Sequence, residues 1–458
     1  MSSKIYLGGF VKKTRLLIRH FFDQSDAWYI LTFFTVIIGI GTVLLMIPAV
    51  WNGVQPLTWT DAAFIASSAV CVVGLATVSI ADFNIAGQII LCILVQIGGL
   101  GIISISSLSL VLPGHRFAFR RINTIQIFYI DGLEYKPRKI ILNILFFTLS
   151  IEGVGAVILA ILFYAAGVDQ WVFAGIFHAV SAFCQAGFST FPEGFEYVAY
   201  NVPILIVTAG LIILGGIGFI VIHDLLRLCR KQVTHISYHS KIALNMSAIL
   251  LFGGTVCFFF LERNNMFQDL NSFESLLQSL FLSVNTRSSG LSTVLQQDLT
   301  QPSQILSCVL MFIGGGAASC AGGIRVTTMF VITVVMLRKP DYYGDINIFH
   351  HRLTAATVNK AVMCTLKAFF LLILFLGALS VTDGTHGKYM GDLVFESCSA
   401  FGSVGLSTGI TADLSTAGKW IIIVAMFAGR VSLMTLTFPS LKQKKYVITY
   451  PQGSLLLE

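Results

Sequence analysis

SAVCVVGLAT, at residues 68–77, carries the pattern that organises this chain: small polar residues, a short run, then a glycine followed by a bulky apolar residue. The pattern recurs as SAFCQAGFST at 181–190, SVNTRSSGLST at 283–293 and SAFGSVGLST at 399–408. Its glycines are Gly74, Gly187, Gly290 and Gly405. They lie roughly a hundred residues apart, far beyond the period of a solenoid repeat. The repeating unit is therefore a whole hydrophobic module.

A short apolar segment leads into each copy of the pattern, at 60–70, 171–183, 273–285 and 392–401. As a helix, such a segment spans about 15–20 Å, too short to cross a hydrocarbon core of roughly 30 Å. Because unpaired backbone cannot face lipid, the glycine-bearing stretch that follows must be buried in protein or line a water-filled path. Four such stretches around one axis would form rings of backbone carbonyls, which can replace the hydration shell of an alkali cation.

The composition indicates a polytopic membrane protein. Of 458 residues, 55% are hydrophobic and only 11% are charged, with a mean hydropathy of +0.83, against about 25% charged in soluble proteins. The nine cysteines are scattered without metal-type pairs, so we interpret them as reduced packing residues. The first apolar run is of spanning length and lacks a small-residue cleavage site, so we expect it to be retained rather than removed as a secretory signal.

Eight full-length spans are predicted, two in each module: 28–50, 87–111, 139–165, 202–226, 240–261, 302–337, 356–381 and 417–439. The predicted modules are 28–111, 139–226, 240–337 and 356–439, with linkers at 112–138, 227–239 and 338–355 and terminal segments at 1–27 and 440–458. Each module would contain a helix, a pore half-helix, a filter-like loop and a second helix. The predicted fold is all-α, with four such modules in a pseudo-fourfold arrangement around a central pore.

The basic residues predict which side of the membrane each segment occupies. Most of the 29 Lys and Arg residues lie in the termini and linkers, whereas the segments on the opposite face hold only Arg263, Lys388 and Lys419. By the positive-inside rule the termini and linkers are cytoplasmic. The net charge of +7 follows this sidedness, so we predict no nucleic-acid partner. Acids on the outer face, such as Asp61 and Asp383, would either form a cation-concentrating vestibule or be ordinary solvated loop residues.

Glycine clusters mark the second span of three modules: IGGLG at 97–101, LGGIG at 214–218 and GGGAASCAGG at 314–323. The first two are typical of close helix packing. In the third, five glycines in ten residues would cost about 5 kcal/mol in a helix interior, at about 1 kcal/mol each. The span 302–337 is also longer than one crossing needs. We therefore predict a helix broken within the membrane by an irregular loop, which is a candidate gate.

Four basic residues fall at membrane depth, and each must face protein or water because an arginine in a helix centre costs at least about 2.5–3.5 kcal/mol. They are Arg287, Arg325, Lys367 and Arg430. Structural pairing and lining of a pathway both remain open for each. Arg430 follows Gly405 at nearly the distance by which Gly314 follows Gly290, so equivalent modules would place Arg430 and Gly314 at the same depth.

Together, these features resemble the Trk/Ktr/HKT superfamily of potassium transporters, and are most similar to its KtrB-type membrane subunit. The resemblance spans the chain from about residue 28 to 438. It implies K⁺ as the transported ion without a cofactor in this chain, a homodimer in lipid, and a cytosolic RCK-type nucleotide-binding regulatory subunit. It also implies a multi-pass protein of the bacterial plasma membrane with both termini cytoplasmic. Whether Na⁺ is required stays open.

The resemblance also assigns site residues. The filter would comprise Cys71, Val72, Val73, Gly74 and Leu75; Cys184, Gln185, Ala186, Gly187 and Phe188; Arg287, Ser288, Ser289, Gly290 and Leu291; and Gly402, Ser403, Val404, Gly405 and Leu406. The gate would comprise Gly314, Gly315, Gly316, Gly322 and Gly323 with Arg430. The chain departs from the common pattern at Cys71, where Thr is usual, at Gln185, where Asn is usual, and at Arg325, where Lys is usual. Cys71 offers a poorer oxygen ligand.

Two other classes of function remain as alternatives to a channel-like cation pathway. A secondary transporter with alternating access usually has inverted repeats and helices broken in both halves, whereas here the repeats run in parallel and only one broken helix is predicted. A membrane enzyme would need catalytic groups, but the intramembrane residues include no HExxH, no nucleophile–His pair and no carboxylate cluster. We predict that the chain is not an enzyme.

Overall fold

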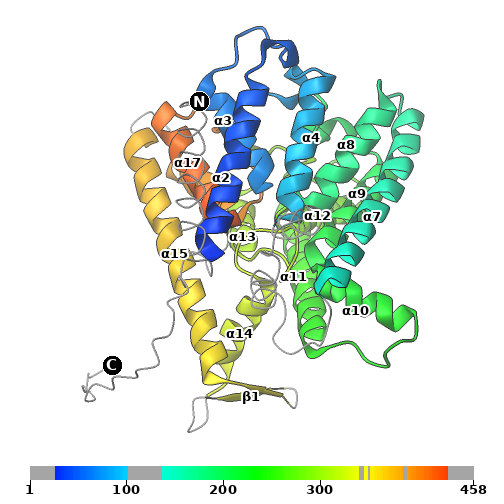
Figure 1. The fold of residues 1–458 in the computed structure, drawn as a ribbon, viewed down its shortest axis with the longest axis vertical. Coiled ribbons are helices and arrows are strands. Elements are labelled where there is room, and N and C mark those ends of the chain that lie inside the picture. Colours follow the sequence, from blue (N-terminus) through cyan, green and yellow to red (C-terminus); the bar gives the residue numbers. More distant parts are fainter. Residues whose placement is uncertain (1–25, 102–136, 340–344, 349–350, 385–388, 432–458) are drawn as a thin grey trace, which may run out of the picture.

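The computed structural model describes residues 26–101, 137–339, 345–348, 351–384 and 389–431 (Figure 1). Helices dominate this part of the chain, and its one pair of named strands forms a short hairpin. The predicted helical class is confirmed in this coarse form. The predicted segments 1–27, 112–138 and 440–458 lie almost wholly outside the described residues.

The helices fall into four quarters that follow the four copies of the glycine pattern. The first quarter contains α2 (Asp26–Leu45), α3 (Trp59–Cys71) and α4 (Ile85–Leu100); the second contains α7 (Pro137–Ala165), α8 (Trp171–Cys184), α9 (Val202–Ile217) and α10 (Phe219–Cys229). The third contains α11 (Tyr238–Glu262), α12 (Ser272–Asn285), α13 (Gln301–Phe312) and α14 (Val326–Leu337); the fourth contains α15 (Ala355–Asp383), α16 (Met390–Gly402) and α17 (Thr416–Arg430). Short 3₁₀ turns occur at Pro48–Val50, Ile80–Asp82, Gly194–Val198 and Gln296–Asp298.

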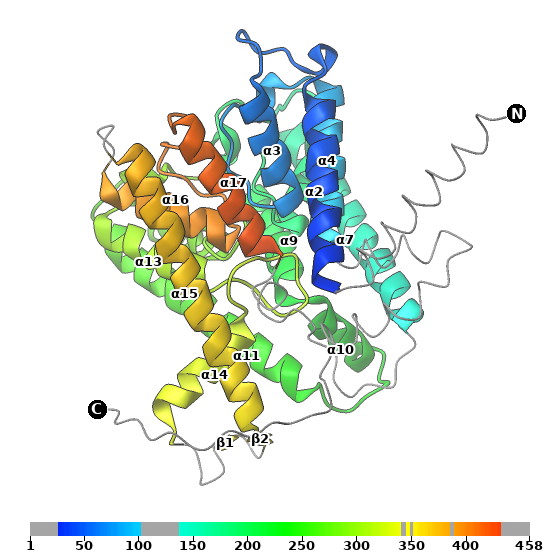
Figure 2. The same ribbon diagram turned by 60° about the vertical axis from the view of Figure 1, so that its left-hand side comes forward.

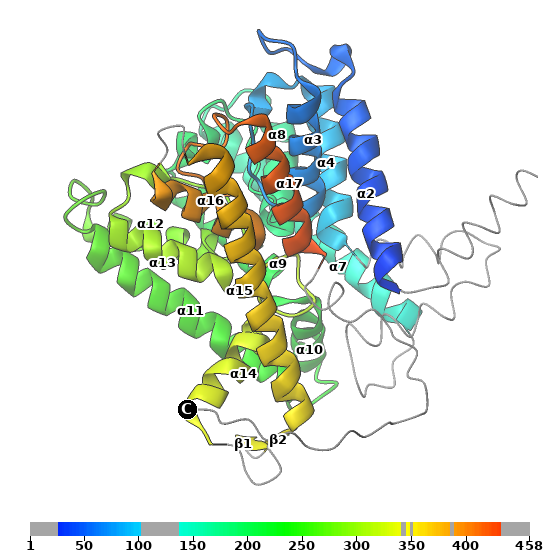
Figure 3. The same ribbon diagram turned by 90° about the vertical axis from the view of Figure 1, so that its left-hand side faces the viewer.

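Helix contacts between quarters run in a circle. Within the first quarter, the short helix α3 packs on α2 and α4 (Figures 2 and 3). Between quarters, α4 packs on α8, α9 on α12, α13 on α16, and α17 on α3. The short helices α3, α8, α12 and α16 therefore each contact the preceding quarter, and the last quarter returns to the first.

The short helices are interior elements and the long ones form the outer surface. Every residue of α3 from Asp61 to Cys71 is buried, as expected for a helix that is apolar on most sides. The long helices instead expose large apolar side chains, including Phe146 at 76%, Phe252 at 63% and Phe370 at 65%. Exposed apolar surface of this extent is typical of helices that face lipid.

Eight membrane spans were predicted from the sequence, but fewer helices of the structure are long and apolar enough to cross a membrane on their own. Among the described residues, three helical segments are long and apolar enough to cross a membrane, Leu142–Ala165, α11 and α15, and the bent pair α9–α10 would add a fourth. The first span ends earlier than predicted because Pro48 opens a 3₁₀ turn after α2. The predicted ends of the spans 87–111 and 417–439 lie outside the described residues.

The second quarter contains a break that the sequence did not predict. A continuous span was expected over 202–226, but α9 and α10 meet at an angle of 103° (Figure 1). Gly218 sits between them with φ 106°, a conformation that favours glycine. The prediction that only one helix is broken is therefore wrong. The expected packing role holds for Gly215, where an added Cβ would overlap the carbonyl oxygen of Phe183.

In the third quarter the predicted helix break over 302–337 is observed. Helix α13 ends at Phe312 and α14 begins at Val326, with residues 313–325 irregular between them. This connection is called the intramembrane loop after its predicted position. Backbone hydrogen bonds from Gly314 N to Ile324 O (2.9 Å) and from Val326 N to Gly315 O (3.1 Å) join its two ends.

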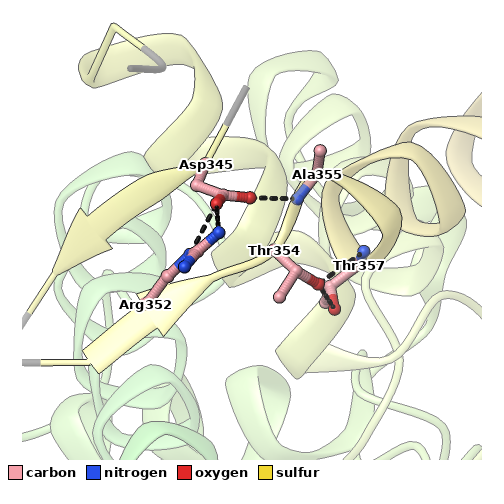
Figure 4. A network of polar contacts seen from close by, with 5 residues as sticks. All are labelled: Asp345, Arg352, Thr354, Ala355 and Thr357. Atoms are coloured by element: carbon pink, nitrogen blue, oxygen red, sulfur yellow. Dashed lines mark hydrogen bonds and ion pairs between the residues drawn. The ribbon is translucent and has the colours of Figure 1, made fainter. Parts of the chain in front are cut away.

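Between α14 and α15 the predicted linker 338–355 contains the hairpin of β1 (Ile346–Ile348) and β2 (His351–Leu353). The Asp345 carboxylate accepts from the Arg352 guanidinium and from the backbone N–H of Ala355 (2.8 Å) (Figure 4). Thr354 then caps α15 by accepting from the N–H of Thr357. These contacts fix the hairpin to the start of α15.

Candidate functional site

The four glycine segments meet in one closed ring. Each glycine faces the carbonyl oxygen of the residue that precedes the glycine of a neighbouring segment, and a Cβ added to any of them would lie less than 3.0 Å from that oxygen. The pairs are Gly74 with Ala186, Gly187 with Ser289, Gly290 with Val404, and Gly405 with Val73. The last pair joins the fourth quarter to the first. A side chain at any of the four positions would push the neighbouring segment away.

Backbone angles in the segments repeat as well. All four glycines have positive φ, and so does the residue two places before each: Val72 (54°), Gln185 (63°), Ser288 (82°) and Ser403 (52°). Left-handed angles at non-glycine residues cost about 1–3 kcal/mol each and persist only where the surroundings impose them. Their recurrence at the same place in all four segments marks a shared backbone geometry.

The serine that opens the pattern explains how this geometry is held. In the first segment the Ser68 carbonyl accepts from Val73 N (2.9 Å), and its hydroxyl accepts from Gly74 N (3.0 Å). In the fourth segment Ser399 accepts from Val404 N and Gly405 N at the same distances. The end of the short helix thus takes up the N–H groups of the segment that follows it.

Four carbonyl groups of the segments have no such partners. Within the described part of the chain, the oxygens of Val73, Ala186, Ser289 and Val404 accept no hydrogen bond. These four oxygens are the ones that meet the neighbouring glycines. The short helices also end at the segments, and a helix C-terminus carries about half a negative charge. The ring therefore presents partial negative charge and free oxygen ligands, which suits a dehydrated monovalent cation.

The side chains of the predicted filter point mainly into the protein. Cys71 is fully buried in an apolar cluster with Phe64 and Phe401. The Cys184 thiol donates to a carboxylate oxygen of Glu152 on α7 (3.5 Å), and Gln185 Nε2 donates to the carbonyl of Ile212 (3.1 Å). The departures at Cys71 and Gln185 therefore alter the packing behind the ring.

Arg287 lies in the third segment by sequence, but its side chain leaves it. Its Nη1 donates to the Ser247 carbonyl (3.0 Å) and its Nη2 to the Ser247 hydroxyl (3.2 Å), both on α11. Of the two roles left open by the sequence, structural pairing describes this guanidinium. Ser288 also faces protein, because its hydroxyl donates to the carbonyl of Gly402 (3.1 Å).

Two arginines bind carbonyl oxygens of the intramembrane loop. Arg430 Nη1 donates to the Cys320 carbonyl, and its Nη2 donates to the carbonyls of Gly98 and Gly99 at the end of α4. Arg325 Nη1 donates to the Ala321 carbonyl at 2.6 Å. Arg430 therefore connects the loop to the first quarter, whereas Arg325 closes the loop on itself.

The break in α9–α10 supplies a third attachment for the loop. Gly216 O accepts from Gly316 N (2.8 Å), Gly215 O accepts from Cys320 N (3.3 Å), and Phe219 N donates to Ala318 O (2.8 Å). The helix end at Gly218 therefore exchanges backbone hydrogen bonds with the loop. Sequence reasoning missed this contact because LGGIG was interpreted as a packing motif. The amphipathic stretch FIVIHDLLRLC that follows it was the available signal.

The loop also contacts the glycine ring. A Cβ on Gly322 would meet the side chain of Ser403 and the carbonyl of Gly402, both in the fourth segment. The residues predicted from sequence as filter and gate are thus adjacent in space.

Two of the acids on the predicted outer face have structural partners. Asp61 on α3 forms an ion pair with Lys419 on α17 (2.9 Å), and both side chains are largely buried. Asp383 is fully buried and accepts from the N–H (2.7 Å) and hydroxyl (2.9 Å) of Ser415. Neither behaves as a solvated loop residue. Both join elements that are separate in sequence.

Comparison with known proteins gives consistent matches over nearly the whole chain. The family model described as TrkH, cation transport protein, matches residues 15–447. The chain is 34% identical over 436 residues to the potassium/sodium uptake protein NtpJ of Enterococcus hirae, covering 93% of this chain and 95% of that protein. It is 34% identical over 431 residues to the Ktr system potassium uptake protein B of Bacillus subtilis, covering 92% and 94%.

A solved structure supports the fold. The potassium transporter TrkH from Vibrio parahaemolyticus matches with a TM-score of 0.72, covering 89% of this chain and 82% of that one, at 19% sequence identity. At this identity the match shows the fold alone. With the family model and the two relatives, it confirms the resemblance drawn from the glycine segments: the chain belongs to the TrkH family of cation transport proteins.

Proposed function

We propose that this protein takes up K⁺ through a channel-like pore whose selectivity filter is the glycine ring. One observation carries the proposal: four segments from four quarters meet with free carbonyl oxygens at every junction. The names of relatives such as the Ktr system potassium uptake protein B support K⁺ as the ion. No covalent chemistry is needed.

The filter consists of the four segments predicted from sequence, 71–75, 184–188, 287–291 and 402–406. A K⁺ ion sheds water as it enters and is coordinated by main-chain carbonyls, with the C-terminal ends of α3, α8, α12 and α16 directed at it. Side chains contribute by holding the backbone, because those of Cys184, Gln185 and Arg287 are engaged behind the ring.

The intramembrane loop is the gate in this proposal, and the hydrogen bonds of Arg430 keep the gate closed (the latch role). The loop lies against the fourth filter segment and is held by Arg430, Arg325 and the end of α9. A fixed guanidinium beside the pathway also repels a departing K⁺, by about 4 kcal/mol at 4 Å for an effective dielectric of 20. Opening would require the loop to release Arg430.

The proposal also covers the symmetry of the pore, the sidedness of the chain and its partners. The circular order of helix contacts supports a pseudo-fourfold pore, and the distribution of Lys and Arg supports cytoplasmic termini and linkers in a bacterial plasma membrane. The family resemblance adds a homodimer and a cytosolic RCK-type nucleotide-binding subunit. Sodium dependence stays open, and the name of the Enterococcus hirae relative makes it worth measuring.

The test is ⁸⁶Rb⁺ uptake into vesicles that contain the purified protein, with and without an imposed membrane potential. A channel-like pore gives uptake that follows the potential and is competed by external K⁺ more strongly than by Na⁺. Uptake that ignores the potential, or that Na⁺ and K⁺ compete equally, would refute the proposal.

Alternating access is kept as a second candidate because the bend at Gly218 provides a second broken helix. It predicts that K⁺ inside the vesicles accelerates Rb⁺ entry by exchange even at zero potential. Single-channel currents in a planar bilayer would exclude it.

A further inference from the structure

A cavity of about 560 Å³ lies between α11, α14 and the β1–β2 hairpin, away from the glycine ring. One group of its lining residues carries hydrogen-bond donors: Tyr238, Lys241, Asn245 and His351. The other group is apolar: Ile242, Met246, Ala248, Ile249 and Phe330. Among the described residues that line the cavity there is no Asp or Glu, so the cavity favours an anionic group joined to an apolar one.

Ring stacking and a hydrogen bond order the polar wall of the cavity. The rings of Tyr238 and His351 stack with centroids 3.9 Å apart and an interplanar angle of 12°. The Tyr238 hydroxyl also donates to the carbonyl of Ile348 in β1 (3.4 Å). The hairpin is itself fixed by Asp345 (Figure 4). Tyr238 and His351 therefore join the start of α11 to the hairpin.

The position of α11 places this wall at the membrane surface. This helix is apolar enough to cross a membrane and has 25 residues. At 1.5 Å per residue it is about 37 Å long, against a hydrocarbon core of roughly 30 Å, so its end turns lie at headgroup depth. Tyr238 is its first residue and Lys241 lies in its first turn. Tyrosine is enriched at this depth.

From the edge of the cavity at Ile249, α11 continues as an exposed apolar stripe. Its members are Ile249 (63% exposed), Phe252 (63%), Val256 (52%) and Phe260 (69%). Their spacing of three or four residues puts them on one face of the helix. A molecule with its anionic end at Lys241 would lay its hydrocarbon chain along this stripe.

We infer that this cavity binds one anionic phospholipid, with its phosphate at Lys241, Asn245 and His351 and one acyl chain against Ile249 and the stripe beyond. A lysine that merely reaches toward the headgroup layer would attract anionic lipid without a bound molecule. The volume of the cavity and its stacked wall distinguish a site from that general attraction. The site is lined by α11 and by α14, the helix that begins where the intramembrane loop ends.

The experiment uses the full-length protein, delipidated in detergent, and native mass spectrometry of bound lipid during titration with phosphatidylglycerol or phosphatidylcholine. We expect one phosphatidylglycerol to be retained per chain in preference to phosphatidylcholine. Lys241→Gln should weaken its retention about fivefold, the effect of one basic residue near an anionic surface, and Lys241→Arg should restore it. Lys360→Gln, an exposed lysine near the start of α15 that does not line the cavity, is the matched control.

A second variant tests the acyl end independently. Ile249→Trp fills the cavity from an exposed position, so it should reduce retention without unfolding the protein. Glycerol phosphate, which has the headgroup without acyl chains, should fail to displace the lipid; displacement would mean a site for free phosphate. Equal losses in Lys241→Gln and Lys360→Gln, or equal retention of the two lipids, would overturn the inference. Because the readout is binding, it is independent of whether the protein transports K⁺.

Discussion

Gly290 is the residue at which the ring can be tested most directly. It has φ 75°, and an added Cβ would overlap the carbonyl oxygen of Val404 and approach the Cα atoms of Gly187 and Gly405. A side chain there must displace two neighbouring segments at once. The consequence is local to the ring, because Gly290 is not within a helix.

Gly290→Ser should lower the preference for K⁺ over Na⁺ while leaving the protein level unchanged. The displaced Val404 carbonyl would no longer match the size of K⁺. The measurement is the ratio of ⁸⁶Rb⁺ to ²²Na⁺ uptake in vesicles. Gly253→Ser is the control, since a Cβ at Gly253 would meet no described atom within 4 Å. A Gly290→Ser ratio equal to wild type would mean that Gly290 is not a filter residue.

Arg430 is the second residue whose role can be isolated. Arg430→Ala should raise K⁺ flux, or leave a leak without stimulation, because it removes the donors to Cys320 and to α4. Hydrogen bonds to charged groups contribute about 1.5–3 kcal/mol, so the open population should rise about tenfold or more. Uptake and melting temperature are measured on the same purified protein.

Arg287→Ala provides the contrast for Arg430, since that guanidinium binds Ser247 and not the loop. It should lower the melting temperature without producing a leak. If Arg430→Ala likewise reduces both flux and stability, Arg430 is structural and the latch role is wrong.

At the scale of elements, the contact between the α9–α10 break and the intramembrane loop links two irregular stretches. Gly218→Ala should weaken it, because residue 218 has φ 106° and an added Cβ would overlap the carbonyl oxygen of Ala317. We expect a loss of more than about 1 kcal/mol of stability, since alanine is incompatible with positive φ, together with increased basal flux.

Gly210→Ala tests whether this effect belongs to the break. Gly210 lies within α9, where a Cβ would meet no described atom within 4 Å, so alanine there should be neutral or stabilising. Melting temperature and Rb⁺ uptake of the two variants decide the matter. Similar values for both would show that the bend does not depend on Gly218.

The two breaks also show what sequence reasoning can and cannot find. Five glycines in ten residues made the loop at 314–323 visible, because no helix interior tolerates that cost. Gly218 was not visible, because LGGIG was interpreted as a packing motif; Gly101, the last glycine of the similar IGGLG, also follows a helix end and has positive φ (46°). Arg287 shows the same limit: register places its backbone in the third segment, but the direction of its side chain depends on α11, which is remote in sequence.

At the scale of the whole molecule, the first and last quarters are joined by the Asp61–Lys419 ion pair between α3 and α17. Removing one partner of a largely buried pair leaves an uncompensated charge, at a cost of about 3–5 kcal/mol. Lys419→Met should therefore lower the melting temperature markedly, whereas Asp61→Asn with Lys419→Met should recover much of the loss. Lys360→Met, at an exposed lysine, should be silent. Additive losses in the double variant would mean that the pair does not couple the quarters.

The joining of Gly405 to Val73 has a consequence for how the protein is made. The ring's first carbonyl and its last glycine lie in opposite ends of the chain, so ribosomes working at about 5–20 residues per second separate their synthesis by tens of seconds. During that interval the chain has no glycine that could meet the carbonyl oxygen of Val73 as Gly405 does. A chain that is terminated before Gly405 lacks the last glycine and cannot close the ring.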